Sequence, residues 1–194
     1  MLAGALSITA IITAMAPQAW GILNAHSEDP VALSQFSGLA QRSILLDVNG
    51  QQVGVFQVKN TQQTPISAVP ELVQNAFIAV EDSVFYEHDG VNLRAVGRAL
   101  LANSQGGGRQ GASTITQQVI KNELLGGKIS GSRLKLLQIR GAVMLEKQLS
   151  KEEILERYLN TVFFGNNAFG LQAAAEVYFG TSVQGLSQNQ GAFL

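Results

Sequence analysis

Residues 76–90 read AFIAVEDSVFYEHDG, in which five apolar residues run directly into two adjacent acids. Upstream lies Pro70, and proline favours the first position of a helix. The pattern therefore predicts a helix over residues 71–80 that ends beside the acids. From this point on, a mainly helical body is expected.

The first acid, Glu81, lies between that apolar run and Phe85. An apolar setting raises the proton affinity of a carboxylate, which suits general acid or base catalysis. Asp82 and His88 are near enough in sequence to orient it. The alternative is an acid at a helix end that faces solvent.

A second polar cluster spans residues 111–118, which read GASTITQQ after a glycine-rich loop. Thr114 and Gln117 have the spacing of a capping box, so a helix is predicted to start there. Hydroxyl and backbone N–H groups at a helix start form an anion site, to which Arg109 and Lys121 would add charge. The alternative is an ordinary capped helix. No Gly-Lys-Ser/Thr sequence occurs, which excludes a Walker-type phosphate loop.

Local signals predict the remaining elements. Asn49-Gly50 is a strong hairpin signal between the strand-like runs 42–47 and 51–58. Capping signals at Asn92, Ser132, Ser150 and Ser187 predict helices over 93–102 and 132–149, a third from 151 and a fourth from 188.

The N-terminal segment suggests export. Residues 2–23 carry no charge and are long enough to cross a bilayer as a helix, and residues 24–41 resemble a linker. A cleaved signal segment and a buried core helix are the alternatives, the first supported by Ala14-Met15-Ala16. At the other end, Leu194 falls inside a predicted helix, so residues 42–194 are interpreted as one domain truncated at its C-terminus.

Composition and charge exclude several classes of protein. The chain of 194 residues has no cysteine, which excludes disulfide frameworks, cysteine-based zinc sites and thiol catalysis. A hydrophobic content of 46% excludes intrinsic disorder. Residues 28–89 carry eight acids and two bases, whereas residues 90–157 carry eleven bases and five acids. Such a cationic segment fits a nucleic-acid patch, an anionic-headgroup surface, a phosphate site or a solvated surface.

Together these clusters resemble the peptidoglycan glycosyltransferase domain, glycosyltransferase family 51, of class A penicillin-binding proteins and monofunctional transglycosylases. Residues 81–90 match the family pattern E-D-x-x-F-x-x-H-x-G, and residues 111–118 match G-G-S-T-I-T-Q-Q except at Ala112. Residues 151–160, KEEILERYLN, match K-x-x-I-L-E-x-Y-L-N. The segment 164–179 follows in the expected order.

One family motif departs from the pattern. Where relatives carry R-K-x-x-E, residues 134–138 read LKLLQ. Lys135 is kept, but Leu134 takes the arginine position and Gln138 the position of the second acid. An amide does not ionise, so any role that needs a negative charge there is lost.

The resemblance implies a mainly α, lysozyme-like lobe with a small N-terminal β-hairpin and an N-terminal transmembrane helix. It implies polymerisation of lipid II into β-1,4 glycan strands with release of undecaprenyl diphosphate. Glu81 would be the catalytic base, and Arg109, Lys121 and Lys135 would neutralise the diphosphate. The residues expected to bind substrate are Asp82, Phe85, His88, Arg109, Ser113, Thr114, Gln117, Gln118, Lys121, Lys135, Gln138, Glu156 and Asn160.

The expected partners are lipid II, the nascent glycan strand, the membrane, a downstream transpeptidase domain and cell-wall synthesis proteins, with no nucleic acid. The expected location is the bacterial cytoplasmic membrane, crossed once, with the catalytic domain on its outer face. No metal ligand is assigned, and a divalent ion, Mg²⁺ or Mn²⁺, would lie at the diphosphate. The alternative functions are a lysozyme-like muramidase and a non-catalytic scaffold that binds lipid II.

Overall fold

A computed structural model describes residues 43–56, 59–104, 113–123 and 132–194. The predicted anchor, the linker and Arg109 lie outside these ranges. Within them, no helix combines the length and apolar character needed to cross a membrane.

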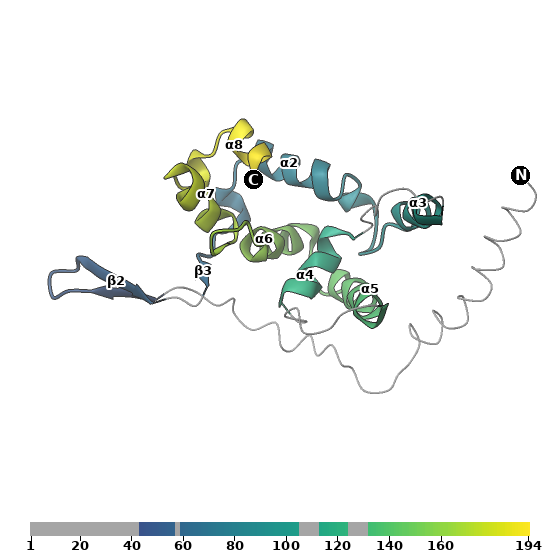
Figure 1. Cartoon of the computed structure of the whole chain (residues 1–194), viewed down its shortest axis with the longest axis horizontal. Coiled ribbons are helices and arrows are strands. Elements are labelled where there is room, and N and C mark those ends of the chain that lie inside the picture. The colour runs from purple at the N-terminus through teal and green to yellow at the C-terminus, as the bar shows by residue number, and fades with distance from the viewer. Residues whose placement is uncertain (1–42, 57–58, 105–112, 124–131) are drawn as a thin grey trace, which may run out of the picture.

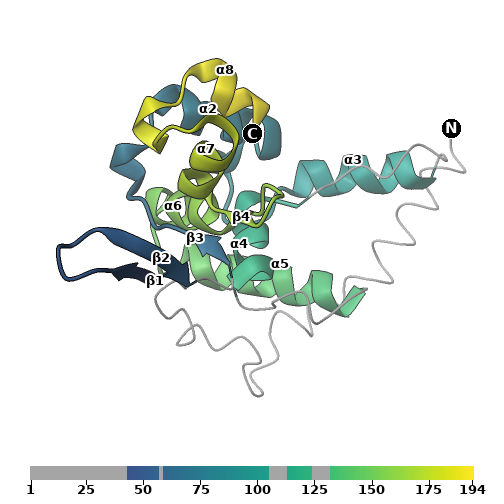
Figure 2. The same cartoon turned by 60° about the vertical axis from the view of Figure 1, so that its left-hand side comes forward.

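The described body is mainly helical, as predicted (Figure 1). One layer holds α2 (Glu71–Glu81), α7 (Leu171–Phe179) and α8 (Gln188–Phe193), with α8 packed on α2. The other holds α4 (Ile115–Glu123), α5 (Ser132–Glu146) and α6 (Lys151–Thr161) (Figure 2). There α4 packs against both α5 and α6, so the polar cluster at its start is held within the body.

The core between the two layers explains why the helices associate. Its fully buried apolar side chains include Val73, Phe85, Ile115, Val119, Ile120, Ile154, Leu155 and Val183. Burial of each such side chain contributes about 1.5–3 kcal/mol relative to exposure. Both motif regions thus supply core residues beside their polar ones.

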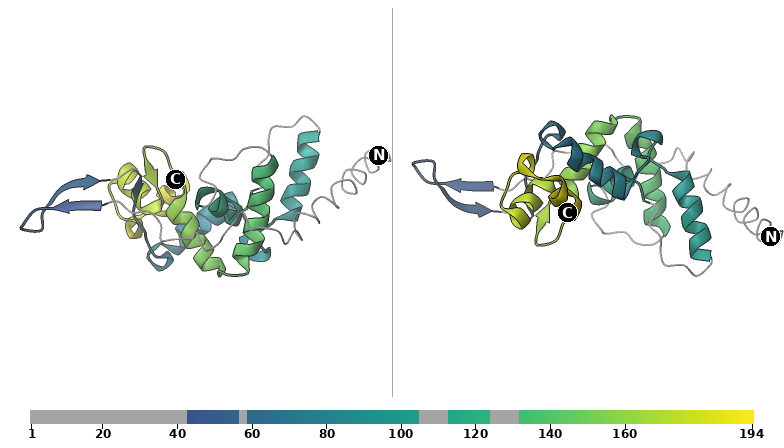
Figure 3. Two further views of the ribbon diagram at one scale, coloured as in Figure 1. Left: turned by 90° about the horizontal axis from the view of Figure 1, so that it is seen from below. Right: turned by 90° about the horizontal axis from the view of Figure 1, so that it is seen from above.

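The predicted hairpin is confirmed. Strands β1 (Ser43–Leu46) and β2 (Gln52–Phe56) pair antiparallel, and the turn places Gly50 at φ 79°. The Asp47 carboxylate accepts hydrogen bonds from the backbone N–H groups of Gln51 and Asn49, which hold the pKa of Asp47 below its ordinary value. The hairpin and α3 (Leu93–Ser104) project from opposite ends of the body (Figure 3).

A short parallel sheet joins the incoming chain to the connection between α6 and α7. Strand β3 (Asn60–Thr61) pairs with β4 (Ala168–Phe169). Three single turns of 3₁₀ helix complete the described elements, namely η2 (Ile66–Ala68), η3 (Phe85–Glu87) and η4 (Val183–Gly185). Of these, η3 lies on the connection between α2 and α3, a few residues after Glu81.

Most predicted helix starts are confirmed. The Asn92 side chain accepts a hydrogen bond from the Ala95 N–H at the start of α3, and reciprocal capping boxes are present at Ser150 and Ser187. The prediction that the helix from Ser132 reaches residue 149 is wrong, because α5 ends at Glu146. There the backbone N–H groups of Lys147 and Gln148 bond carbonyls only three residues back, which ends the α-helical pattern. Thr116 and Lys151 bind the Glu146 carboxylate and fix the helix end.

Gly170 provides a test of this packing. It precedes α7 with φ 84° and ψ 157°, which glycine alone adopts readily, and a Cβ would lie 2.7 Å from the Asn160 carbonyl oxygen. We expect Gly170→Ala to lower the free energy of unfolding by about 3 kcal/mol in urea titrations. The control Gly180→Ala, at φ 61° with open space around it, should cost about 1 kcal/mol. Equal losses would contradict the steric argument.

Candidate functional site

A cavity of about 460 Å³ lies between the end of α2, the start of α4 and one face of α5. Its lining residues are Val80, Glu81, Ser113, Gln117, Gln118, Lys121 and Gln138. All except Val80 are polar, and all six polar residues were candidates from the sequence. Folding therefore brings the two motif regions together with Gln138, the position at which the chain differs from the family pattern.

Glu81 is the last residue of α2 and its side chain is exposed on the cavity. Gln118 on α4 donates a hydrogen bond from Nε2 to Glu81 Oε2 at 2.7 Å. The apolar surroundings expected from the sequence are not found, because the lining is largely polar. The carboxylate is thus oriented by an amide and open to a ligand.

Asp82 and His88 bind one another rather than Glu81. The Asp82 side chain is 2% exposed, and its Oδ2 lies 2.9 Å from His88 Nε2. His88 Nδ1 accepts a hydrogen bond from the Gly90 N–H, so the proton of the neutral ring is assigned to Nε2, which donates to Asp82. The Ile115 N–H at the start of α4 also donates to Asp82 Oδ2.

This arrangement occupies two backbone donors of the anion site predicted at the start of α4. The Ile115 N–H is occupied by Asp82, and the Gln117 N–H is occupied by Thr114 Oγ1. These two backbone donors are therefore not free for an anion. Among the side chains of the cavity lining, Lys121 offers a positive charge.

The capping box predicted for α4 is only half formed. Thr114 caps the helix, but the Gln117 amide turns away and donates to the Gly90 carbonyl at 3.3 Å, which Thr114 Oγ1 also contacts at 2.7 Å. Gly90 has φ 85°, and a Cβ there would lie 2.8 Å from the Ala142 carbonyl carbon. The end of the first motif is thus fixed closely against α4 and α5.

Lys135 places a cation behind the cavity wall. Its ammonium donates to Ser113 Oγ at 2.9 Å and to Gln117 Oε1 at 2.6 Å, and it pairs with no carboxylate among the described residues. Burial lowers the pKa of Lys135 below its ordinary value. Lys121 supplies a second, exposed cation in the lining. An anion entering the cavity would meet the charge of Lys121 in the lining and lie near that of Lys135 behind Ser113 and Gln117.

Gln138 is buried, at 6% exposed, and lines the cavity from α5. It leaves Glu81 as the one carboxylate of the lining, and no group of three acids and histidines able to hold a metal occurs among the described residues. Divalent cations prefer several oxygen ligands, commonly carboxylates. The described lining therefore does not form a cation site by itself.

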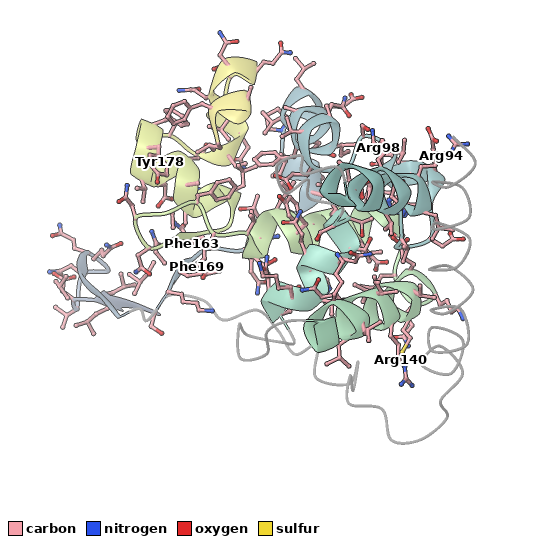
Figure 4. All side chains as sticks on the ribbon, turned by 45° about the vertical axis from the view of Figure 1, so that its right-hand side comes forward. Arg94, Arg98, Arg140, Phe163, Phe169 and Tyr178 are labelled. Atoms are coloured by element: carbon pink, nitrogen blue, oxygen red, sulfur yellow. The ribbon has the colours of Figure 1, made fainter. Side chains whose placement is uncertain are left out.

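A smaller cavity of about 160 Å³ shares Val80, Glu81 and Ser113 with the larger one. Its lining also includes Asp82 and Thr114, and Asn92 and Arg98 of the α3 region. Sequence reasoning missed Arg98, although Arg94 and Arg98 recur four residues apart in the basic segment. Figure 4 shows both on α3, with Arg140 on α5 at the same end of the molecule.

Besides His88 and Lys135, three predicted residues lie away from both cavity linings. Phe85 is fully buried in the core. The Asn160 side chain bonds both backbone groups of Thr64, and Glu156 accepts a hydrogen bond from the Ile66 N–H. Glu156 and Asn160 hold the chain that enters α2, and their predicted contact with substrate stays a prediction.

Comparison with known proteins agrees with these motifs. Residues 49–194 match the Transglycosylase family. Penicillin-binding protein 1F of Bacillus subtilis (strain 168) is 40% identical over 153 residues, which is 78% of this chain and 21% of that protein. Penicillin-binding protein 1A of Clostridium botulinum (strain Langeland) is 38% identical over 172 residues, or 85% and 21% respectively. The chain spans about a fifth of the length of the curated relatives it matches.

The half-buried ammonium of Lys135 predicts a pH dependence of stability. Because its pKa is lowered on folding, the unfolded chain binds more protons between that lowered pKa and the ordinary value of 10.5. The free energy of unfolding therefore gains from this group as pH rises through that window. In urea titrations, the free energy of unfolding of the parent minus that of Lys135→Gln should increase as the pH rises toward 10.5. A difference that stays constant from neutral pH upward would contradict the burial of a charged ammonium.

Proposed function

The chain belongs to the transglycosylase family, and from this we propose that it is a peptidoglycan glycosyltransferase. The proposed reaction polymerises lipid II into β-1,4 glycan strands and releases undecaprenyl diphosphate. The observation that carries the proposal is the exposed Glu81 carboxylate, oriented by Gln118 on a polar cavity beside two lysines.

In this proposal Glu81 is the general base. Its carboxylate takes the proton of the 4-hydroxyl of one substrate while that oxygen attacks the anomeric carbon of the other. The bond from that carbon to the diphosphate oxygen breaks, and its electron pair leaves with the diphosphate. Attack on the face opposite the leaving group converts an α-linked donor into a β-linked product.

Lys135 and Lys121 are proposed to stabilise the departing diphosphate. Negative charge develops on that group as the bond breaks, and a cation in a partly buried site stabilises it more strongly than one in water. Lys135 already has two neutral hydrogen-bond acceptors and no carboxylate partner among the described residues, so its charge remains available to the diphosphate. Arg109 is a further candidate for this role.

The remaining lining side chains would bind sugar and phosphate oxygens. Ser113, Gln117, Gln118 and Gln138 offer hydroxyl and amide groups, which match such oxygens without adding charge. Thr114, Asp82 and His88 would act by holding the loop and helix around them. A divalent ion at the diphosphate would depend on the substrate's own oxygens, because the described lining offers only Glu81.

The muramidase alternative is less well supported. Most glycosidases use a pair of carboxyl groups about 5–9.5 Å apart across the bond that they cleave. Among the described residues, Glu81 is the only acid in the larger lining, and one oxygen of Asp82 is already bound by His88 and Ile115. The non-catalytic alternative gains support from Gln138, and product analysis with labelled lipid II separates it from polymerisation and from cleavage.

The proposed location follows from the substrate. A lipid-linked donor stays in the bilayer, so the domain would work at the outer face of the bacterial cytoplasmic membrane, held there by residues 2–23 as a single span. The proposed partners are the nascent glycan strand, a transpeptidase domain and other cell-wall synthesis proteins.

Glu81→Gln is the direct test of the proposed base. It keeps the shape of the side chain and removes its basicity, so lipid II polymerisation should fall by about 10²- to 10⁴-fold. Glu87→Gln is the matched control, because Glu87 is an exposed acid of the same segment outside both cavity linings. Equal rates for Glu81→Gln and the parent would exclude this residue as the base.

Gln138→Glu tests whether the amide limits the reaction. A carboxylate restored in the lining would add the negative charge that relatives carry, and we expect a higher rate of lipid II turnover that becomes sensitive to a chelator. Turnover should be measured for both proteins with and without the chelator. A parent already at full rate, and unchanged by the substitution, would show that the amide is no defect.

A further inference from the structure

We propose that Lys151 is a positioning residue for the catalytic carboxylate, acting through the backbone of His88 and the side chain of Glu146. The proposal rests on the proposed glycosyltransferase function of Glu81. It assigns a task to a half-buried ammonium that lines neither cavity.

The contacts of Lys151 are unusually complete for a lysine. Its ammonium donates to the His88 carbonyl at 2.6 Å and to Glu146 Oε1 at 2.8 Å, and it lies 4.5 Å from the centroid of the Phe85 ring. The side chain of Lys151 is 19% exposed and that of Glu146 only 5%. An ammonium has three protons, and a carbonyl, a carboxylate and an aromatic face together account for all three.

Lys151 lies at a helix position where a cation is not favoured, so its presence there needs another reason. It is the first residue of α6, whose start is fixed by the capping box of Ser150 and Glu153. A cation at a helix N-terminus opposes the helix dipole, whereas acids are favoured there. Helix stability therefore gives no reason for a lysine at this position. The reason lies in what the ammonium holds.

Two routes lead from Lys151 to Glu81. In the first, the ammonium fixes the His88 backbone, His88 donates to Asp82, and Asp82 is the neighbour of Glu81 in the chain. In the second, Glu146 Oε1 also accepts a hydrogen bond from Thr116 on α4, two residues before the Gln118 that contacts Glu81.

One ammonium thus joins the segment after α2 to α4, α5 and α6. Loss of it would leave the cavity lining in place but would loosen the carboxylate relative to the amide that orients it. A misplacement of about 1 Å in a catalytic group can cost a factor of about 100 in rate. Lys151 should accordingly control turnover more than binding.

The experiment compares Lys151→Met with the double variant Lys151→Met/Glu146→Gln in the full chain. The single variant leaves a buried carboxylate without its cation, which destabilises a fold, whereas the double variant removes that charge and keeps an acceptor for Thr116. For the folded double variant we expect kcat for lipid II polymerisation to fall about 10- to 100-fold, with KM within about twofold. Lys147→Met is the matched control, because Lys147 is exposed and makes no ion pair or hydrogen bond through its side chain with the described residues.

Hydrogen exchange provides a readout that does not depend on catalysis. In the double variant, amides of the Asp82–Gly90 segment should exchange at least about 10-fold faster, while those of α7 stay unchanged. Unchanged exchange in that segment, or a kcat equal to that of the parent, would overturn the proposal. If the parent itself makes no glycan, the proposed function fails, and the exchange result alone decides whether Lys151 fixes the segment.

Discussion

The site depends on one buried carboxylate that belongs to two elements at once. Asp82 directly follows the last residue of α2. Its Oδ2 accepts a hydrogen bond from His88 Nε2 at 2.9 Å and another from the Ile115 N–H at the start of α4. A buried carboxylate without such donors would be costly, so these bonds fix the end of α2 against the start of α4. Glu81 and Gln118, each a few residues away, are thereby brought within 2.7 Å.

In the folded protein, the bases of the cationic segment, residues 90–157, differ from one another in what they contact. Some bases of the cationic segment act within the body, as when Lys151 binds Glu146 and Arg157 binds Glu123 at 2.8 Å. Burial raises the pKa of Glu123 even though the Arg157 charge opposes that shift. Lys135 instead donates to Ser113 and Gln117 and pairs with no carboxylate among the described residues, and Arg94 and Arg98 are exposed on α3 (Figure 4). The described part of the segment is therefore neither a uniform basic patch nor a fully neutralised surface.

Turns and helix caps, which depend on residues close together in the sequence, were predictable. The Asn49-Gly50 turn, the Asn92 cap and the boxes at Ser150 and Ser187 depend on residues two to four positions apart, and the structure has all of them. The capping box at Thr114 formed only in part, because the Gln117 side chain bonds Gly90 and Lys135 instead. A capping rule based on nearby residues fails there because these partners, distant in the sequence, compete for the Gln117 amide.

The sequence by itself determined the family, the helical class and the set of polar residues that line the cavity, because motif order, helical periodicity and capping are properties of nearby residues. The tertiary structure decided which of those residues meet. It bonded the Ile115 N–H of α4 to Asp82, exposed Glu81, half-buried Lys135 and placed Glu156 and Asn160 against the segment that enters α2. Each of those contacts joins residues 18 to 96 positions apart, and only the packing of the helices brings such residues together.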